Sequence, residues 1–194
     1  MHKARGRLGA FTLVELLVVV AIIGTLAGFL VPNIIRARVQ AKKVQCLNNV
    51  KGIGAMLQTF SDNPSKGGFP FGNGKAPLAF ESLQKLVDEY PDDLKPAQFI
   101  CPESDDFAAD TDEKNRYLLS EDSCSYAYLS QKKRSAKGTT ILLSDDSVRD
   151  EENGIEVNHE GGWNVYYGDN SAKFLDRKDF PDVSVPPGLV GNHN

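Results

Sequence analysis

Acidic side chains between residues 145 and 152 form the densest group of metal-binding residue types in this 194-residue chain. Asp145, Asp146 and Asp150 offer hard oxygen donors, which Ca²⁺ prefers. The group lacks a spaced Asp-x-Asp-x-Asp-Gly loop. The pattern therefore favours a solvated acidic loop over a calcium site, and calcium is the one cofactor that the sequence suggests.

His159 and Asp169, with nine residues between them, are also residue types that could act in catalysis or bind a metal. The segments 163–167 and 171–175, joined by the turn 168–170, predict a β-hairpin with Asp169 in its turn. His159 then lies before the first strand, about 16 Å or more from Asp169, because each strand residue advances about 3.3 Å. We expect Asp169 to shape the turn and His159 to form hydrogen bonds where the strand begins.

Cys46, Cys101 and Cys124 cannot all pair within one chain, although an exported domain accommodates one disulfide bond. There is no Cys-x-x-Cys pair, which argues against a zinc site. Of the three histidines, His2 and His193 lie near the ends of the chain, so no nucleophile–base constellation is visible. We therefore expect no enzymatic activity.

An apolar run from Phe11 to Val31 dominates the organisation of the chain. As a helix its 21 residues span about 31 Å, which is enough to cross a bilayer core of roughly 30 Å. Glu15 is the only charge in the run. Insertion of a carboxylate at the bilayer centre costs about 2.5–3.5 kcal/mol, so we expect Glu15 to have an interaction partner or a functional role.

Residues 1–10 form a short basic leader that ends in Gly9 and Ala10, small residues that precede the apolar run instead of following it. Cleavage before the helix would leave the helix on the mature chain and create an α-amino group on Phe11. In a bilayer this ammonium would neutralise Glu15 of a neighbouring chain. The alternative is a protonated, unpaired Glu15 near the headgroups.

The segment 11–24, with Pro32 closing the membrane half of the helix, resembles the start of type IV pilins and type II secretion pseudopilins. The resemblance implies that a prepilin peptidase cuts between Ala10 and Phe11 and N-methylates Phe11, and that Glu15 helps to draw the subunit into a filament. Gly9 is a departure, because the family usually has glycine directly before the cut.

The same resemblance implies a location and a set of partners. The leader would lie in the cytoplasm, the helix would cross the inner (cytoplasmic) membrane once, and the head would be periplasmic or extracellular. Expected partners are the prepilin peptidase and methyltransferase, copies of the chain, other prepilins and inner-membrane components of the secretion system.

Beyond the apolar run, hydrophobic residues continue on one helical face, which predicts a helix that extends to residue 60. This face comprises Ile35, Val39, Cys46, Val50, Ile53, Leu57 and Phe60. In the head, the pattern predicts a helix at 81–90 and strands at 125–129 and 139–143, besides the hairpin. An α+β fold follows, with a long N-terminal helix packed on a small antiparallel sheet, as the pilin resemblance also implies.

The expected organisation has five parts, with loops at 61–77 and 102–116. They are a basic leader (1–10), a transmembrane helix (11–31), the soluble half of the spine helix (32–60), a globular head (61–180) and a flexible tail (181–194). Residues 1–60 carry a net charge of +7 and the remaining residues a net charge of −11. Because an acidic head repels phosphates, we expect no nucleic-acid partner.

Three further segments, 45–54, 99–105 and 125–128, resemble prepilin-like proteins abundant in planctomycetes and verrucomicrobia. Those proteins are named for a His followed after nine residues by Asp-Gly. Here Asn170 replaces the glycine after Asp169, and asparagine also tolerates the left-handed turn conformation. The family pattern includes Cys46 and Cys101 and favours a disulfide between them. A Cys101–Cys124 bridge and the absence of any bridge are the alternatives.

The sequence thus predicts a membrane-inserted, prepilin-like structural subunit that joins a type II secretion pseudopilus or a type IV pilus-like filament. The alternative is an anchored, non-polymerising module that uses the pilin leader for delivery and binds polysaccharide through Trp163, Tyr166 and Tyr167. Aromatic residues in strands more often pack in a core than form a sugar platform. Polymerisation should depend on Glu15, whereas glycan binding should survive in a head that lacks residues 1–32.

Overall fold

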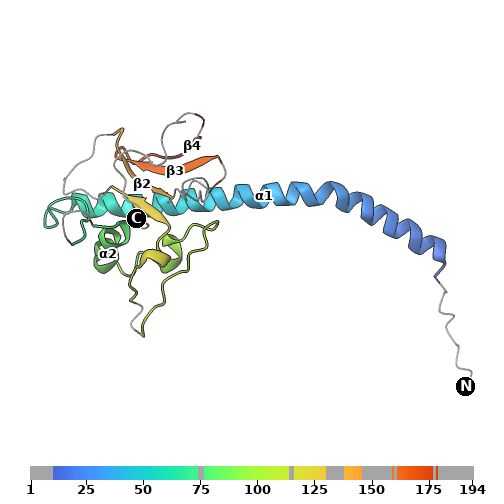
Figure 1. Cartoon of the computed structure of the whole chain (residues 1–194), viewed down its shortest axis with the longest axis horizontal. Coiled ribbons are helices and arrows are strands. Elements are labelled where there is room, and N and C mark those ends of the chain that lie inside the picture. The colour runs from blue at the N-terminus through green and yellow to red at the C-terminus, as the bar shows by residue number, and fades with distance from the viewer. Residues whose placement is uncertain are drawn as a thin grey trace, which may run out of the picture. The chain divides into compact units, whose positions relative to one another are not determined.

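The structure is a computed structural model that describes residues 11–73, 77–113, 116–129, 138–145, 159, 161–176 and 178. Its elements are α1 (Leu13–Asp62), α2 (Ala79–Glu89), the 3₁₀ turns η1 (Pro96–Phe99) and η2 (Glu121–Ser123), β1 (Tyr126–Tyr128), β2 (Ile141–Asp145), β3 (Gly162–Tyr167) and β4 (Ala172–Asp176) (Figure 1). The chain divides into two compact units, Met1–Ala41 and Lys42–Asn194, each of which is described by itself.

The four strands form one antiparallel sheet in the order β1-β2-β3-β4. The hairpin of β3 and β4 confirms the predicted hairpin. In its turn, Asn170 adopts a left-handed φ of 67°. The Asp169 carboxylate accepts hydrogen bonds from the backbone N–H (2.9 Å) and the hydroxyl (2.6 Å) of Ser171. Asp169 therefore shapes the turn, as predicted.

The other predicted elements of the head are also present, with shifted ends. Helix α2 corresponds to the predicted segment 81–90, and β1 to the predicted strand at 125–129. Strand β2 begins and ends two residues later than predicted and includes Asp145. The sequence had placed Asp145 in a solvated loop, and this placement is wrong because Ser144 and Asp145 are buried between β1 and β3.

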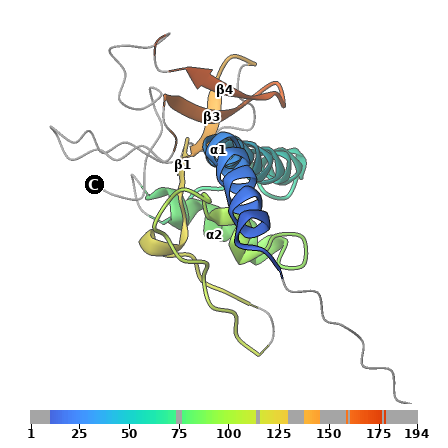
Figure 2. The same ribbon diagram turned by 90° about the vertical axis from the view of Figure 1, so that its right-hand side faces the viewer.

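The C-terminal part of α1 supplies one wall of the main core. Its buried side chains include Cys46, Val50, Ile53 and Leu57, which recur at helical spacing and confirm this part of the predicted face. Figures 1 and 2 both place this part of α1 between α2 and strands β3 and β4. Ile35, predicted on the same face, is 58% exposed and belongs to the N-terminal unit. The long apolar helix is therefore packed on a small antiparallel sheet in an α+β arrangement.

Gly54 allows α1 to approach β3 closely. A Cβ at this position would lie 2.4 Å from Cγ of Tyr166 on β3, well inside van der Waals contact. A Cβ at Gly52, one half-turn earlier, would meet only the side-chain amide of Gln98, at 3.8 Å. Close packing therefore requires glycine at position 54 but not at position 52, although both residues lie in α1.

We expect Gly54→Ala to destabilise the head by about 1–3 kcal/mol, because the added methyl group overpacks the contact with Tyr166. Gly52→Ala is the matched control, and it should stabilise the head by up to about 1 kcal/mol through helix propensity. Trp163, the only tryptophan of the chain, is buried in β3, so its fluorescence during urea unfolding measures both effects. Equal effects of the two substitutions would contradict the close approach.

Candidate functional site

The first candidate site is the N-terminal end of α1. The Thr12 side chain accepts a hydrogen bond from the Glu15 N–H (3.2 Å), while Glu15 Oε2 accepts bonds from the Thr12 N–H (2.9 Å) and hydroxyl (2.7 Å). This reciprocal arrangement is a capping box, which satisfies N–H groups that the first helical turn leaves unpaired. It directs the Glu15 carboxylate back towards Thr12 at the start of the helix. The Thr-x-x-Glu spacing is typical of a capping box, but this role of Thr12 was not predicted from the sequence.

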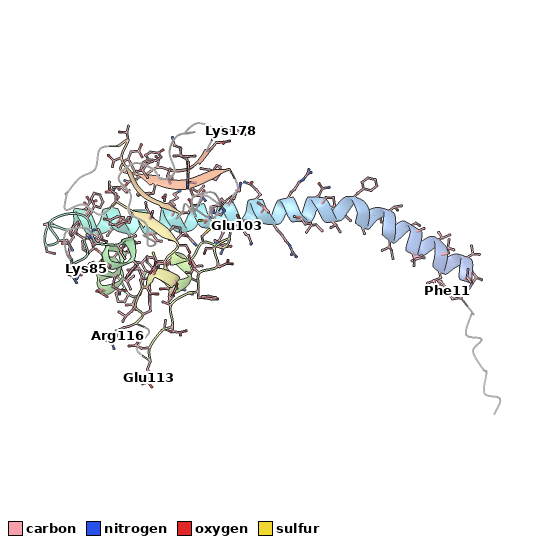
Figure 3. The ribbon with its side chains drawn as sticks, viewed as in Figure 1. Phe11, Lys85, Glu103, Glu113, Arg116 and Lys178 are labelled. Carbon is pink, nitrogen blue, oxygen red and sulfur yellow. The ribbon has the colours of Figure 1, made fainter. Side chains whose placement is uncertain are left out.

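Side chains of the N-terminal unit project from the helix on all sides (Figure 3). Every residue from 11 to 38 is exposed, and Phe11 is 72% exposed. By length and composition, α1 is the one helix among the described residues that is able to cross a membrane. The helix continues through Pro32, and the Asn33 side chain donates a hydrogen bond to the Phe29 carbonyl (3.0 Å). Pro32 therefore lies inside α1 and does not end it.

The second candidate site is a buried cluster in the head that contains two thiols, an imidazole and a carboxylate. Cys46 comes from α1, Cys101 follows η1, Asp145 ends β2 and His159 precedes β3. His159 Nε2 lies 3.4 Å from Cys101 Sγ and 3.2 Å from Asp145 Oδ2. Cys46 Sγ lies 3.4 Å from the same Asp145 oxygen. One ligand atom from each of Cys46, Cys101 and His159 lies within 4.8 Å of the other two.

Neighbouring polar groups hold this cluster in place. Glu103 Oε2 lies 2.8 Å from His159 Nδ1, and the turn that carries Glu103 is closed by the Ser104 N–H, which donates to the Cys101 carbonyl (3.0 Å). Asn164 donates from its backbone N–H (2.7 Å) and its side-chain amide (2.8 Å) to the two Asp145 oxygens. The orientation of both the imidazole and the carboxylate is therefore set by partners outside the cluster.

Contacts within the cluster shift the pKa values of His159, Cys101 and Cys46 in different directions. Burial lowers the pKa of His159, but hydrogen bonds to Asp145 and Cys101 outweigh burial and raise the pKa to about 10. A hydrogen bond with Cys46 lowers the pKa of Cys101, and His159 lowers it further. The same bond between the thiols, together with burial and the Asp145 charge, raises the pKa of Cys46. Cys101 is thus the thiol that ionises first.

Cys101, His159 and Glu103 follow the order of nucleophile, base and orienting carboxylate that activates a cysteine for catalysis. A catalytic thiol must reach a substrate, yet Cys101 is 0% exposed and the His159 side chain is also buried. Asp145 competes for the same imidazole nitrogen that would accept the thiol proton. The arrangement is therefore suited to holding parts of the head together or to enclosing an ion.

No protein-family model, curated protein or solved structure matches this chain. The expected resemblance to pilins therefore rests on the sequence segments alone.

The structure separates His159 from Asp169, because the first contacts Glu103 and Asp145 while the second bonds to Ser171 in the hairpin turn. Asp145 points into the buried cluster, whereas Asp146 and Asp150, its partners in the calcium prediction, lie outside the described residues. The cut between Ala10 and Phe11 also involves a residue outside the described ones, since the description begins at residue 11.

The cysteines carry free thiols in the structure. Cys46 and Cys101, the pair that the family pattern favours for a bridge, are neighbours in the buried cluster. Cys124 instead donates a weak hydrogen bond to the Tyr126 carbonyl (3.9 Å). Spacing along the chain had argued against zinc, but the structure brings together sulfur and nitrogen donors that are far apart in sequence.

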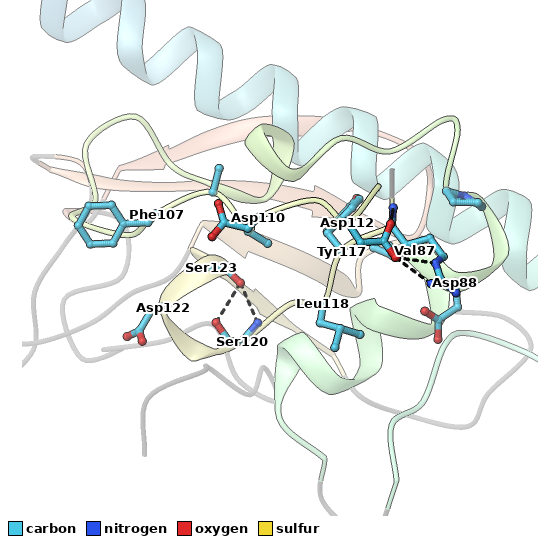
Figure 4. A pocket seen from close by; sticks show the side chains of 14 residues that line it. Val87, Asp88, Phe107, Asp110, Asp112, Tyr117, Leu118, Ser120, Asp122 and Ser123 are labelled. Carbon is cyan, nitrogen blue, oxygen red and sulfur yellow. Dashed lines mark hydrogen bonds and ion pairs between the residues drawn. The ribbon is translucent and has the colours of Figure 1, made fainter. Parts of the chain in front are cut away.

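Two other surfaces bear on ligand binding. Trp163 and Tyr166 are buried (3% and 1% exposed) and Tyr167 is half-buried, so these three residues do not form the exposed aromatic platform that a polysaccharide would need. A groove of about 800 Å³ lies between α2 and the segment that leads to η2, with the exposed side chains of Phe107 and Leu118 on its walls (Figure 4). No residue of the buried cluster lines this groove.

Proposed function

We propose that the chain is a prepilin-like structural subunit that is processed at its N-terminus and assembles into a type II secretion pseudopilus or a type IV pilus-like filament. The observation that supports the proposal is the capping box at the start of α1, which holds the carboxylate of Glu15, the only charge of the apolar segment, at the N-terminal end of the helix. A plain membrane anchor does not need a carboxylate within its apolar segment, because the charge only adds to the cost of insertion.

Assembly gives this carboxylate a partner. Removal of residues 1–10 creates an ammonium on Phe11, and each subunit then brings one cation and one anion to the same end of its helix. Pairing across subunits neutralises both charges in a medium of low dielectric constant, where attraction is strong. Leaving either charge unpaired in that medium is costly. The pairing therefore favours several subunits over one.

The apolar surface of the N-terminal unit supports the same proposal. Its large hydrophobic side chains are about half exposed or more, and Phe29 is 78% exposed. In the membrane, lipid covers them; in a filament, the helices of neighbouring subunits cover them. Each square ångström of apolar surface removed from water contributes about 25 cal/mol, so burial of these side chains against one another favours a bundle over separate helices outside the bilayer. The acidic heads then face outwards from a helical filament core.

The processing step is directly measurable. We expect the full chain, expressed with a prepilin peptidase, to lose residues 1–10 and to gain one methyl group on Phe11. Intact-mass spectrometry of the membrane fraction reports both changes, and a host without the peptidase is the control. If the chain stays uncut in the presence of an active peptidase, the proposal is wrong and the chain is a simple signal-anchored protein.

A further inference from the structure

We propose that Cys46, Cys101, Asp145 and His159 bind one structural zinc ion inside the head. All four residues are buried. In order along the chain, they lie in α1, just after η1, at the end of β2 and just before β3. Two thiolates, one imidazole and one carboxylate form a donor set that zinc binds in tetrahedral sites. This role is independent of filament assembly.

Three of the six separations between ligand atoms agree with a tetrahedron around one ion. Zinc bonds of about 2.3 Å to sulfur and about 2.0–2.1 Å to nitrogen and oxygen place S and N ligands about 3.6 Å apart, S and O about 3.5 Å, and N and O about 3.3 Å. The corresponding separations are 3.4 Å (Cys101 Sγ to His159 Nε2), 3.4 Å (Cys46 Sγ to Asp145 Oδ2) and 3.2 Å (His159 Nε2 to Asp145 Oδ2). Each agrees to within about 0.2 Å. The ligand atoms of Cys46, Cys101 and His159 lie within 4.8 Å of one another, and Asp145 Oδ2 contacts two of these three residues, Cys46 and His159.

The groups around the ligands are those that a zinc site requires. A metal-bound histidine usually donates its other ring N–H to a carboxylate, which fixes the tautomer. Glu103 lies 2.8 Å from His159 Nδ1 and is placed to accept that proton. Zinc then displaces the proton of Nε2, the nitrogen that faces Cys101 and Asp145, because a ligating imidazole is neutral. Asn164 orients the ligating carboxylate in the same way, through the hydrogen bonds to its two oxygens.

The donor set also discriminates between ions. Calcium and magnesium take oxygen ligands and have no use for two sulfurs. Soft thiolates with an imidazole in a tetrahedral arrangement favour zinc. Because four protein ligands leave no open position for water, the site is of the structural type and not of the catalytic type.

A disulfide between Cys46 and Cys101 is the competing occupant. It would employ the two sulfurs alone and would require an S–S distance of about 2.05 Å. The structure has free thiols, and each sulfur also contacts a different polar ligand, Asp145 for Cys46 and His159 for Cys101. A disulfide gives no reason for an imidazole and a carboxylate to converge on the sulfurs, whereas a zinc ion accounts for all four groups.

The test is the zinc content of the full chain, isolated from membranes in detergent without chelators and measured by inductively coupled plasma mass spectrometry. We expect one zinc per chain and three titratable thiols after denaturation with a chelator. Cys101→Ser should retain less than a tenth of the zinc. Cys124→Ser is the matched control, because it removes a buried thiol outside the cluster, and it should retain the full zinc content.

A zinc-free chain with one titratable thiol would establish the disulfide and overturn the proposal. A zinc-free chain with three thiols would overturn it as well. If Cys101→Ser does not fold, cobalt replacement in the unmodified chain decides the matter. Tetrahedral cobalt bound to thiolates gives intense visible and charge-transfer absorption, and its absence after exchange would count against the site. Neither measurement depends on processing or on filament formation.

Discussion

Glu15→Ala should be processed and inserted into the membrane like the unmodified chain, yet form almost no filaments. Removing one partner of a buried ion pair costs about 3–5 kcal/mol, and every 1.4 kcal/mol changes an equilibrium about tenfold. The yield of sheared filaments should therefore fall by more than about 100-fold. The measurement is quantitative immunoblotting of the sheared fraction against the membrane fraction.

Thr25→Ala is the matched control for this experiment. Thr25 is a polar residue of the same apolar segment, but its hydroxyl only donates to the Ile22 carbonyl of its own helix (2.8 Å). Its loss leaves no charge unpaired, so filament yield should stay near that of the unmodified chain. Normal filaments from Glu15→Ala would remove the assembly role of the carboxylate. Equal losses in both variants would point to a general defect of the helix.

Asp145→Ala should be the most damaging single substitution in the head, with a loss of about 3–5 kcal/mol of unfolding free energy. The Asp145 carboxylate is 2% exposed and contacts His159, Cys46 and the two N–H groups of Asn164. Alanine leaves these buried groups without their acceptor, which is costly whether or not an ion is bound. Urea unfolding of the full chain, followed by Trp163 fluorescence, measures the loss.

Asp176→Ala provides the comparison, because Asp176 also ends a strand of the same sheet. Its side chain is 46% exposed, accepts a hydrogen bond from the Lys178 backbone N–H (3.0 Å) and lies 3.8 Å from the Lys178 ammonium group. Exposed ion pairs contribute little, so the effect should stay within about 0.5 kcal/mol. Similar losses in the two aspartate variants would contradict the view that the buried cluster organises the head.

Local sequence patterns predicted the main helix and strands of the head, because turn residues and hydrophobic spacing act over a few neighbouring residues. The turn chemistry of Asp169 and Asn170 identified the β3–β4 hairpin, and both residues behave in the turn as the sequence indicated. Helical spacing identified the buried face of α1 from Cys46 onwards. The end of β2 was missed because Asp145 begins a run of acidic residues, which suggests a solvated loop until its buried partners are known.

The buried cluster could not be predicted in the same way. Cys46, Cys101, Asp145 and His159 are distant in sequence, and only the packing of α1 against the sheet and the preceding segment brings them together. Metal-ligand motifs are recognisable in sequence when the ligands are a few residues apart, which is not the case here. By contrast, the capping box of Thr12 and Glu15 is a local pattern, and it was open to prediction.

Electron microscopy of sheared material tests most directly whether this chain polymerises through its N-terminal helix. The material comes from cells that express the chain with its peptidase and assembly proteins, and it is labelled with an antibody against the head. We expect thin filaments decorated along their length by the antibody. A correctly cut chain that stays in the membrane fraction, with no labelled filaments, would contradict this expectation.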